Sequence, residues 1–153
     1  MALSAGEKAP KFELMDNEGN LRKLSDYQGQ TIVVYFYPRD NTPGCTKEAC
    51  SFRDAYADFR AAGVEVIGIS PDSERSHSKF IEKFELPFTL LSDPDHQVCE
   101  AFGVWGPKKM AGREYEGVYR TTFIIGPDGV IKEVFENVKP ADHSQEVLAA
   151  VMA

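Results

Sequence analysis

The core of this protein begins with an unbroken run of β-branched and aromatic residues at 31–37 (TIVVYFY). A continuous apolar run without polar alternation is typical of a strand that is buried on both faces. Pro38 and residues 40–44 then provide turn-forming residues. Apolar side chains recur at helical spacing over 45–62, and Gly63 is a typical residue to end that helix. The sequence therefore predicts a buried strand, a turn and a helix in direct succession.

The other segments alternate between strand and helix patterns in the same way. This order predicts an α/β fold with a central mixed β-sheet flanked by helices. The 153 residues fit a single domain over 1–153. In such a sheet a ligand binds at the carboxyl end of a central strand, here beside residues 38–45. We expect hairpin strands at 12–14 and 21–24, further strands at 64–70, 88–91, 114–120, 121–125 and 130–135, and helices at 73–84, 94–102 and 142–152, the last capped by Asp142.

The charge and the cysteine content narrow the classes of function. The chain has 17 basic and 24 acidic residues, a net charge of −7, so we expect no binding to nucleic acid or to an anionic membrane. No apolar run approaches the ~20 residues of a membrane helix, and the N-terminus shows no secretory signal pattern. Three cysteines are too few for a disulfide scaffold. We therefore expect a cytoplasmic protein whose cysteines are reactive, metal-bound or buried.

Cys45 stands at the predicted start of the helix that follows the buried strand. If Thr42 is the N-cap residue, Pro43 takes the first helical position and Cys45 the third. The Thr42 hydroxyl then reaches the amide of the second or third helical residue, close to the sulfur. Free amide donors and the positive end of the helix dipole favour the thiolate, which is the nucleophilic form. The alternative, a small buried core cysteine, fits a helix start less well.

Cys50 follows Cys45 by five residues on the same predicted helix. In an intact helix two such positions lie about 8–9 Å apart and point ~140° away from each other. A disulfide needs Cα atoms within about 6.8 Å, so the two can bond only if the first helical turns unwind. The spacing is neither the C-x-x-C of thioredoxin-type sites nor a usual zinc spacing. A core-facing role for Cys50 remains an alternative.

The segment around Cys45 resembles the active site of the peroxiredoxins. The family's Pro-x-x-x-Thr-x-x-Cys motif stands here as Pro38, Thr42 and Cys45, and the longer form Thr-Pro-Gly-Cys-Thr-x-Glu-Ala-Cys is similar to the bacterioferritin comigratory protein, or Q-type, subfamily. The resemblance implies a thioredoxin-like fold and reduction of hydroperoxides by a thiol, without metal, haem or flavin. It extends over nearly the whole chain, through residues 6–12, 67–70, 91–93, 102–106 and the strand at Arg120.

The resemblance also implies a role for each matching residue. Cys45 corresponds to the peroxidatic cysteine, Thr42 to the hydroxyl that holds the thiolate and the peroxide oxygens, and Pro38 to the residue that shields the sulfur from water. Arg120 corresponds to a strand-borne arginine that favours the thiolate and binds the peroxide. Glu48 is expected to orient Arg120. The alternatives are a surface ion pair for Arg120 and a favourable first-turn charge for Glu48.

Cys50 matches the resolving cysteine of those subfamily members that carry one in the same helix. The resemblance thus implies a sulfenic acid on Cys45, an intramolecular Cys45–Cys50 disulfide, and recycling by thioredoxin or a similar dithiol. No cysteine stands in the last third of the chain, which argues against a resolving cysteine from a partner subunit, and we expect a monomer.

Two other functions stay open, and several residues are expected to have no chemical role. A disulfide reductase is disfavoured by the five-residue cysteine spacing, and a non-enzymatic redox sensor would react once without turnover. Cys99 is expected to fill the core. The histidines His77, His96 and His143 show no ligand spacing, so we expect no metal site.

Overall fold

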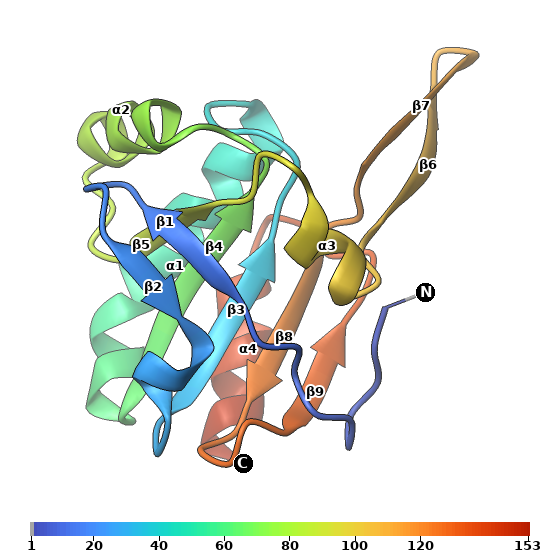
Figure 1. Cartoon of the computed structure of the whole chain (residues 1–153). Coiled ribbons are helices and arrows are strands. Elements are labelled where there is room, and N and C mark those ends of the chain that lie inside the picture. The colour runs from blue at the N-terminus through green and yellow to red at the C-terminus, as the bar shows by residue number, and fades with distance from the viewer. Residues whose placement is uncertain (1) are drawn as a thin grey trace.

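A mixed sheet of seven strands forms the centre of the protein (Figure 1). The computed structural model describes residues 2–153, and of Met110 only the backbone. The strand order is β2-β1-β5-β4-β3-β8-β9; β3, β4 and β5 are parallel, and β8 is antiparallel to β3. The strands are β1 (Glu13–Asp16), β2 (Leu21–Lys23), β3 (Thr31–Phe36), β4 (Val64–Ser70), β5 (Thr89–Ser92), β8 (Thr121–Ile125) and β9 (Ile131–Phe135).

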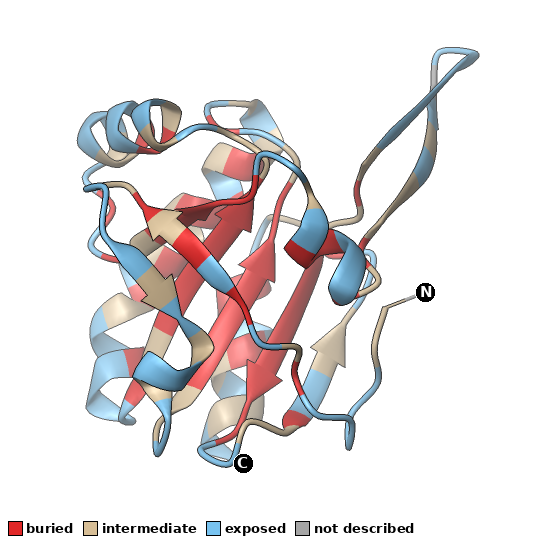
Figure 2. Ribbon diagram, viewed as in Figure 1, coloured by how far each residue is buried: buried red, intermediate tan, exposed pale blue. Residues whose placement is uncertain are grey.

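Strand β3 divides the hydrophobic core into two halves. Successive strand residues point to opposite faces, so Val33 and Tyr35 pack in the half that contains Phe52 of the long helix. Val34 and Phe36 pack in the other half, on the opposite face of the sheet. The central strands β3, β4, β5 and β8 are almost entirely buried, whereas the edge strands β2 and β9 are partly exposed (Figure 2). This burial on both faces explains why the segment lacks polar alternation.

Helices cover both faces of this sheet. Helices α1 (Pro43–Ala61), α2 (Glu74–Phe84) and α4 (His143–Met152) contribute to the half of the core that contains Tyr35. The short helix α3 (Gln97–Ala101) packs in the other half, and a 3-10 turn, η1 (Leu24–Tyr27), follows β2. No helix in the described part of the chain is long and apolar enough to cross a lipid bilayer.

A two-stranded arm projects from the body of the protein (Figures 1 and 2). It consists of β6 (Trp105–Met110) and β7 (Arg113–Val118), which pair in antiparallel register. Its far end is exposed, whereas Val118 at its base is buried. The sequence predicted only the second of these strands, since Gly106 and Pro107 favour a turn over a strand. Strand β6 exists because it pairs with β7.

Most expected elements are confirmed, with three differences. The helix expected at 94–102 is shorter, because only Gln97–Ala101 is α-helical. The strand expected at 114–120 ends at Val118, so Arg120 lies in the link before β8 and not within a strand. Asp142 is the N-cap residue of α4, but its side chain makes no capping hydrogen bond. Its backbone is left-handed, with φ of 61°, whereas a capping side chain needs an extended N-cap residue.

Candidate active site

Helix α1 begins directly behind β3 and places Cys45 in its first turn. Thr42 is the N-cap residue with an extended backbone, and Pro43 is the first helical residue, as the sequence predicts. The Thr46 amide donates to the Thr42 carbonyl at 2.8 Å and closes the first helical turn. Cys45 is therefore the third helical residue, and only 1% of its surface is exposed. The sulfur is therefore enclosed by the core at the start of the helix.

Cys45, Arg120 and Glu48 form a continuous chain of contacts. Arg120 Nη2 donates to Cys45 Sγ at 3.2 Å, and Arg120 Nη1 donates to Glu48 Oε1 at 2.7 Å. The sheet explains why residues so distant in sequence meet, since Thr121 at the start of β8 pairs with Phe36 at the end of β3. Arg120 is 17% exposed and Glu48 fully buried, so this is not the solvated ion pair of the alternative interpretation.

Gly44 allows the guanidinium to approach the helix start. A Cβ at this position would lie 3.2 Å from Arg120 Nη2 and 3.5 Å from Pro140 Cγ. The first of these contacts is tighter than nine in ten Cβ contacts in proteins and the second is an ordinary van der Waals contact, so a larger residue would shift the guanidinium by a few tenths of an ångström. Glycine at this position therefore favours the close approach of Arg120, and its role does not depend on a special backbone conformation.

Burial controls the protonation of the acidic partner. It raises the pKa of Glu48 from its ordinary value of 4.5 to about 7, and the Arg120 charge and hydrogen bond only partly oppose this rise. Burial also acts against the charged form of Arg120, but Glu48 and Cys45 outweigh it and raise the pKa of the guanidinium. Glu48 Oε2 is buried and has no hydrogen-bond partner among the described residues. The arginine remains a cation, whereas Glu48 exchanges a proton near neutral pH.

The Thr42 side chain does not do what the sequence predicts. Its hydroxyl makes no capping hydrogen bond to α1 and donates instead to the Arg39 carbonyl at 2.9 Å. A hydroxyl has one proton to donate, so that bond leaves only the oxygen lone pairs free for a further partner. Towards any further partner the Thr42 hydroxyl can therefore act only as a hydrogen-bond acceptor. Pro38, between β3 and this loop, is partly buried.

The three cysteines differ in environment, and all are free thiols in this structure. Cys50 is partly exposed and lies in the same intact helix as Cys45. Cys99 is fully buried, which confirms the prediction that it belongs to the core. Burial, together with the neighbouring Asp93, raises the pKa of the Cys99 thiol far above its ordinary value. Cys99 is thus an inert thiol, since the thiolate is the reactive form.

Lys108 is a second cation near the site that the sequence did not predict. It extends from the middle of β6, and its Nζ donates to the Val118 carbonyl at the base of the arm at 2.9 Å. Burial and then the Arg120 charge lower the pKa of its ammonium group. Only the pairing of β6 with β7 brings this lysine towards Arg120, so residue spacing carries no signal for it.

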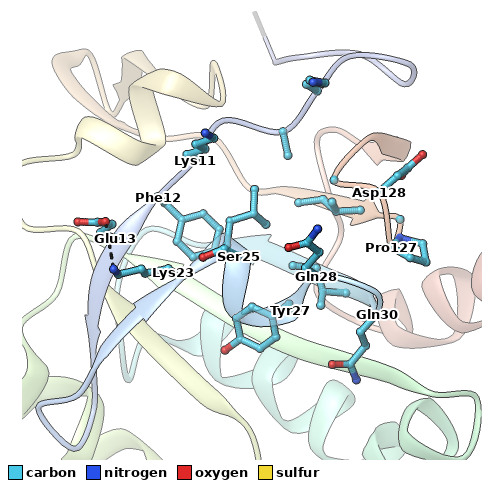
Figure 3. A pocket seen from close by; sticks show the side chains of 17 residues that line it. Lys11, Phe12, Glu13, Lys23, Ser25, Tyr27, Gln28, Gln30, Pro127 and Asp128 are labelled. Atoms are coloured by element: carbon cyan, nitrogen blue, oxygen red, sulfur yellow. Dashed lines mark ion pairs between the residues drawn. The ribbon is translucent and has the colours of Figure 1, made fainter.

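A pocket of about 350 Å³ lies away from these residues (Figure 3). It opens at the amino end of β3, where Gln30 and Ile32 line it, whereas Cys45 follows the carboxyl end of the same strand. Phe12 and Tyr27 contribute to its wall, and Lys23 pairs with Glu13 across 3.7 Å at its rim. None of the residues assigned to the active site lines this pocket.

A thioredoxin-like sheet with an arginine-bound cysteine at the start of α1 defines a thiol peroxidase of the peroxiredoxin class. The AhpC/TSA family model matches residues 5–134, and the chain belongs to the AhpC/TSA family. Peroxiredoxin Bcp of Escherichia coli is 51% identical over 146 residues, which cover 95% of this chain and 94% of that protein. Peroxiredoxin Bcp of Bacillus subtilis is 49% identical over 148 residues, or 97% of this chain and 94% of that protein.

Solved structures agree with this assignment. Peroxiredoxin Q of Xanthomonas campestris superposes with a TM-score of 0.88 at 38% identity, over 92% of this chain and 89% of that chain. A PrxQ mutant of Xylella fastidiosa gives a TM-score of 0.94 at 36% identity, over 99% of this chain and 97% of that chain. These similarities confirm the predicted thioredoxin-like fold and the predicted Q-type resemblance.

Proposed function

We propose that Cys45 is the peroxidatic cysteine of this thiol peroxidase and that it reduces hydrogen peroxide and organic hydroperoxides. The observation that carries the proposal is the 3.2 Å contact between Arg120 Nη2 and Cys45 Sγ in a buried helix start. A cation at the sulfur and the positive end of the helix dipole favour the thiolate. A similar protein, the Xanthomonas campestris bacterioferritin comigratory protein, is described as having alkyl peroxide reduction activity.

The first step transfers one peroxide oxygen to sulfur. The Cys45 thiolate attacks that oxygen, the S–O bond forms as the O–O bond breaks, and the second oxygen leaves with the bonding pair. That oxygen takes up a proton and departs as water or alcohol, so sulfur is oxidised to sulfenic acid and the peroxide is reduced. Arg120 stabilises the charge that moves along the O–O bond, and Thr42 accepts a hydrogen bond from the peroxide O–H. Glu48 positions Arg120, and Pro38 shields the sulfur.

The second step joins Cys45 to Cys50. The Cys50 thiol attacks the sulfenic sulfur, its proton combines with the departing hydroxide, and water leaves as the disulfide forms. Since α1 is intact over both residues, its first turns must unwind before the sulfurs can meet. Thioredoxin or a similar dithiol then reduces the disulfide by thiol exchange. No cysteine of a second subunit is needed, so we place a monomeric enzyme in the reducing cytoplasm.

Peroxide consumption by Cys45→Ser tests the proposal. We expect the purified variant to fold normally and to lose turnover, because a serine hydroxyl stays protonated and is a poor nucleophile here. Turnover near the wild-type rate would remove Cys45 from the mechanism. A disulfide reductase would reduce a model disulfide but consume hydroperoxide slowly, and a sensor would oxidise once without multiple turnover in the presence of thioredoxin and its reductase.

A further inference from the structure

A buried polar cluster lies beneath the loop that leads to Cys45. Tyr37 and His77 are completely buried and Asp40 is 8% exposed. Asp40 Oδ1 accepts from the Tyr37 hydroxyl at 2.5 Å, and Asp40 Oδ2 accepts from the Ser76 hydroxyl at 2.7 Å. The same Oδ2 lies 2.7 Å from His77 Nδ1. The chemistry of the active site makes no use of these side chains, yet Asp40 stands five residues before the proposed nucleophile.

The hydrogen bonds of His77 fix how many protons this cluster holds. His77 Nε2 lies 3.0 Å from the Leu91 carbonyl oxygen, which can only accept, so Nε2 carries a proton. If Nδ1 had none, its lone pair would face the carboxylate oxygen at 2.7 Å in a buried site. The Nδ1–Oδ2 contact therefore contains a proton. Asp40 and His77 together are either an imidazolium–carboxylate pair or a neutral acid and imidazole, and neither leaves an unpaired buried charge.

The backbone of the loop is attached at the same place. The Asp40 amide donates to Asp72 Oδ2 at 2.8 Å, and Asp72 in turn accepts from the Ser70 hydroxyl at 2.7 Å. Asn41, the next residue, has a left-handed backbone with φ of 57°. The loop thus turns sharply at a point where both the backbone and the side chain of Asp40 are bound to the β4–α2 region. Beyond this point come Thr42 and the start of α1.

Hydrogen bonds already occupy several atoms of this cluster that could bind a metal ion. Asp40, Asp72 and His77 have ligand atoms within 4.8 Å of one another. His77 Nδ1, Asp40 Oδ2 and Asp72 Oδ2 already have hydrogen-bond partners: the proton-bearing Nδ1–Oδ2 contact joins His77 to Asp40, and the Ser70 hydroxyl and the Asp40 amide donate to Asp72 Oδ2. A metal ion would have to displace the proton between His77 Nδ1 and Asp40 Oδ2. We therefore interpret the cluster as a hydrogen-bonded pair and not as a metal site.

We propose that Asp40 and His77 are positioning residues, whose shared proton anchors the loop that presents Thr42 and Cys45 to the peroxide. This inference rests on the proposed role of Cys45. The anchor lies on the strand side of Asn41, whereas the turns that must unwind lie on the helix side. It therefore keeps the loop in place during unwinding and returns Cys45 to Arg120 when the disulfide is reduced. Small misplacements of a nucleophile reduce rates strongly, which gives the anchor its effect on the first step.

Two substitutions of Asp40 test whether its hydrogen bonds hold the loop. Asp40→Ala removes both acceptors. Asp40→Asn keeps the shape, since its amide oxygen accepts from Tyr37 and its NH₂ group donates to a neutral His77 Nδ1. We expect Asp40→Ala to slow the single-turnover oxidation of Cys45 by hydrogen peroxide at least about tenfold and Asp40→Asn by less than about threefold. The exposed Asp95→Ala is the matched control and is expected to react like the wild type.

A second measurement uses the unmodified, reduced protein. ¹⁵N-resolved NMR is expected to show a proton bound at or shared with His77 Nδ1 at neutral pH, assigned by its loss in His77→Gln. Amide hydrogen exchange over residues 39–46 is expected to be faster in Asp40→Ala than in Asp40→Asn. A His77 Nδ1 without a proton overturns the proposal even if Asp40→Ala does not fold. So does a folded Asp40→Ala that reacts at the wild-type rate, or an Asp40→Asn as slow as Asp40→Ala.

These readouts also separate this inference from the proposed function. If wild type and Cys45→Ser consumed peroxide equally, the role of Cys45 would fall. The NMR signal and the exchange rates would still report on the Asp40–His77 pair, because neither requires a reaction with peroxide.

Discussion

Glu48 combines complete burial with a carboxyl group that has one oxygen unpartnered in the described structure. Burial raises its pKa from 4.5 to about 7, against the opposing effect of Arg120. Between these values the folded protein binds more protons than the unfolded chain, so the contribution of Glu48 to the free energy of unfolding falls as pH rises. The decrease amounts to the order of 3 kcal/mol and ends above about pH 7.

Glu48→Gln should abolish this pH dependence, because the amide does not titrate. Urea unfolding of the reduced protein from about pH 5 to 8 is expected to show the variant gaining stability relative to the wild type as pH rises. Glu100→Gln, an exposed substitution, is the control and should follow the wild-type profile. Parallel profiles for wild type and Glu48→Gln would mean that Glu48 is already ionised at the acid end of this range.

Arg120 touches the sulfur and the buried carboxyl at once. Arg120→Ala is expected to slow the first step by about 10- to 100-fold, the loss typical of one charged donor at a reacting centre. Arg120→Lys should recover only part of the rate, because a single ammonium group cannot copy the fork that reaches both Cys45 and Glu48. Stopped-flow single turnover measures both variants, with Arg113→Ala on the exposed arm as the control. An Arg120→Ala rate equal to that of the control would make Arg120 purely structural.

At the scale of single residues, residue types and their spacing predict only part of the active site. Cys45 could be predicted because a strand, a turn and a helix start are local features of the sequence. Arg120 was found through the resemblance, since nothing in its neighbours marks it. The direction of the Thr42 hydroxyl was predicted wrongly, because it depends on where the Arg39 carbonyl points. The contact between Asp40 and His77, 37 residues apart, requires the packing of α2 and has no sequence signal.

Among the elements, α1 has two conflicting requirements. In the proposed cycle its first turn must be intact to hold Cys45 against Arg120, and it must then open for Cys45 to reach Cys50. Cys50→Ser is expected to keep the fast first step, to form no disulfide within α1, and to become sensitive to excess peroxide through sulfinic acid formation. Cys99→Ser, at a buried and inert thiol, should do none of this. Peptide mapping after one equivalent of peroxide identifies which cysteines form the disulfide. A Cys45–Cys99 bond with a free Cys50 would overturn the resolving role of Cys50.

Contacts between α1 and α4 oppose the opening of α1. The Ser51 and Ser144 hydroxyls are 2.5 Å apart, and Phe52 packs edge-on against His143 with ring centroids 5.6 Å apart. Ser144→Ala removes a hydrogen bond worth about 1 kcal/mol, so the disulfide should form about fivefold faster while the first step keeps its rate. The exposed Gln145→Ala is the control. Double-mixing stopped flow separates the two steps, and an unchanged second step would show that α4 does not limit the opening.

At the scale of the whole molecule, local sequence patterns predicted the strands and helices of the body but missed one of the two strands of the arm. The strands β3 and β4 are continuous apolar runs, so burial on both faces could be predicted from composition alone. In contrast, β6 contains Gly106, Pro107 and lysines, and its structure depends on the partner strand β7. The arm carries Lys108 towards Arg120, so the missed strand and the missed cation have one cause.

The surface of the whole molecule bears on its assembly. Among the described residues the exposed large apolar side chains are Leu21 on β2, Tyr115 on the arm and Met152 near the end of α4. These lie on separate elements and form no continuous apolar patch, whereas stable dimers usually bury one. We therefore expect a monomer of 17.0 kDa in both the reduced and the disulfide forms. Sedimentation equilibrium over a wide concentration range measures this, and a concentration-dependent rise to twice that mass would show that a polar interface, or the opened α1, joins two copies.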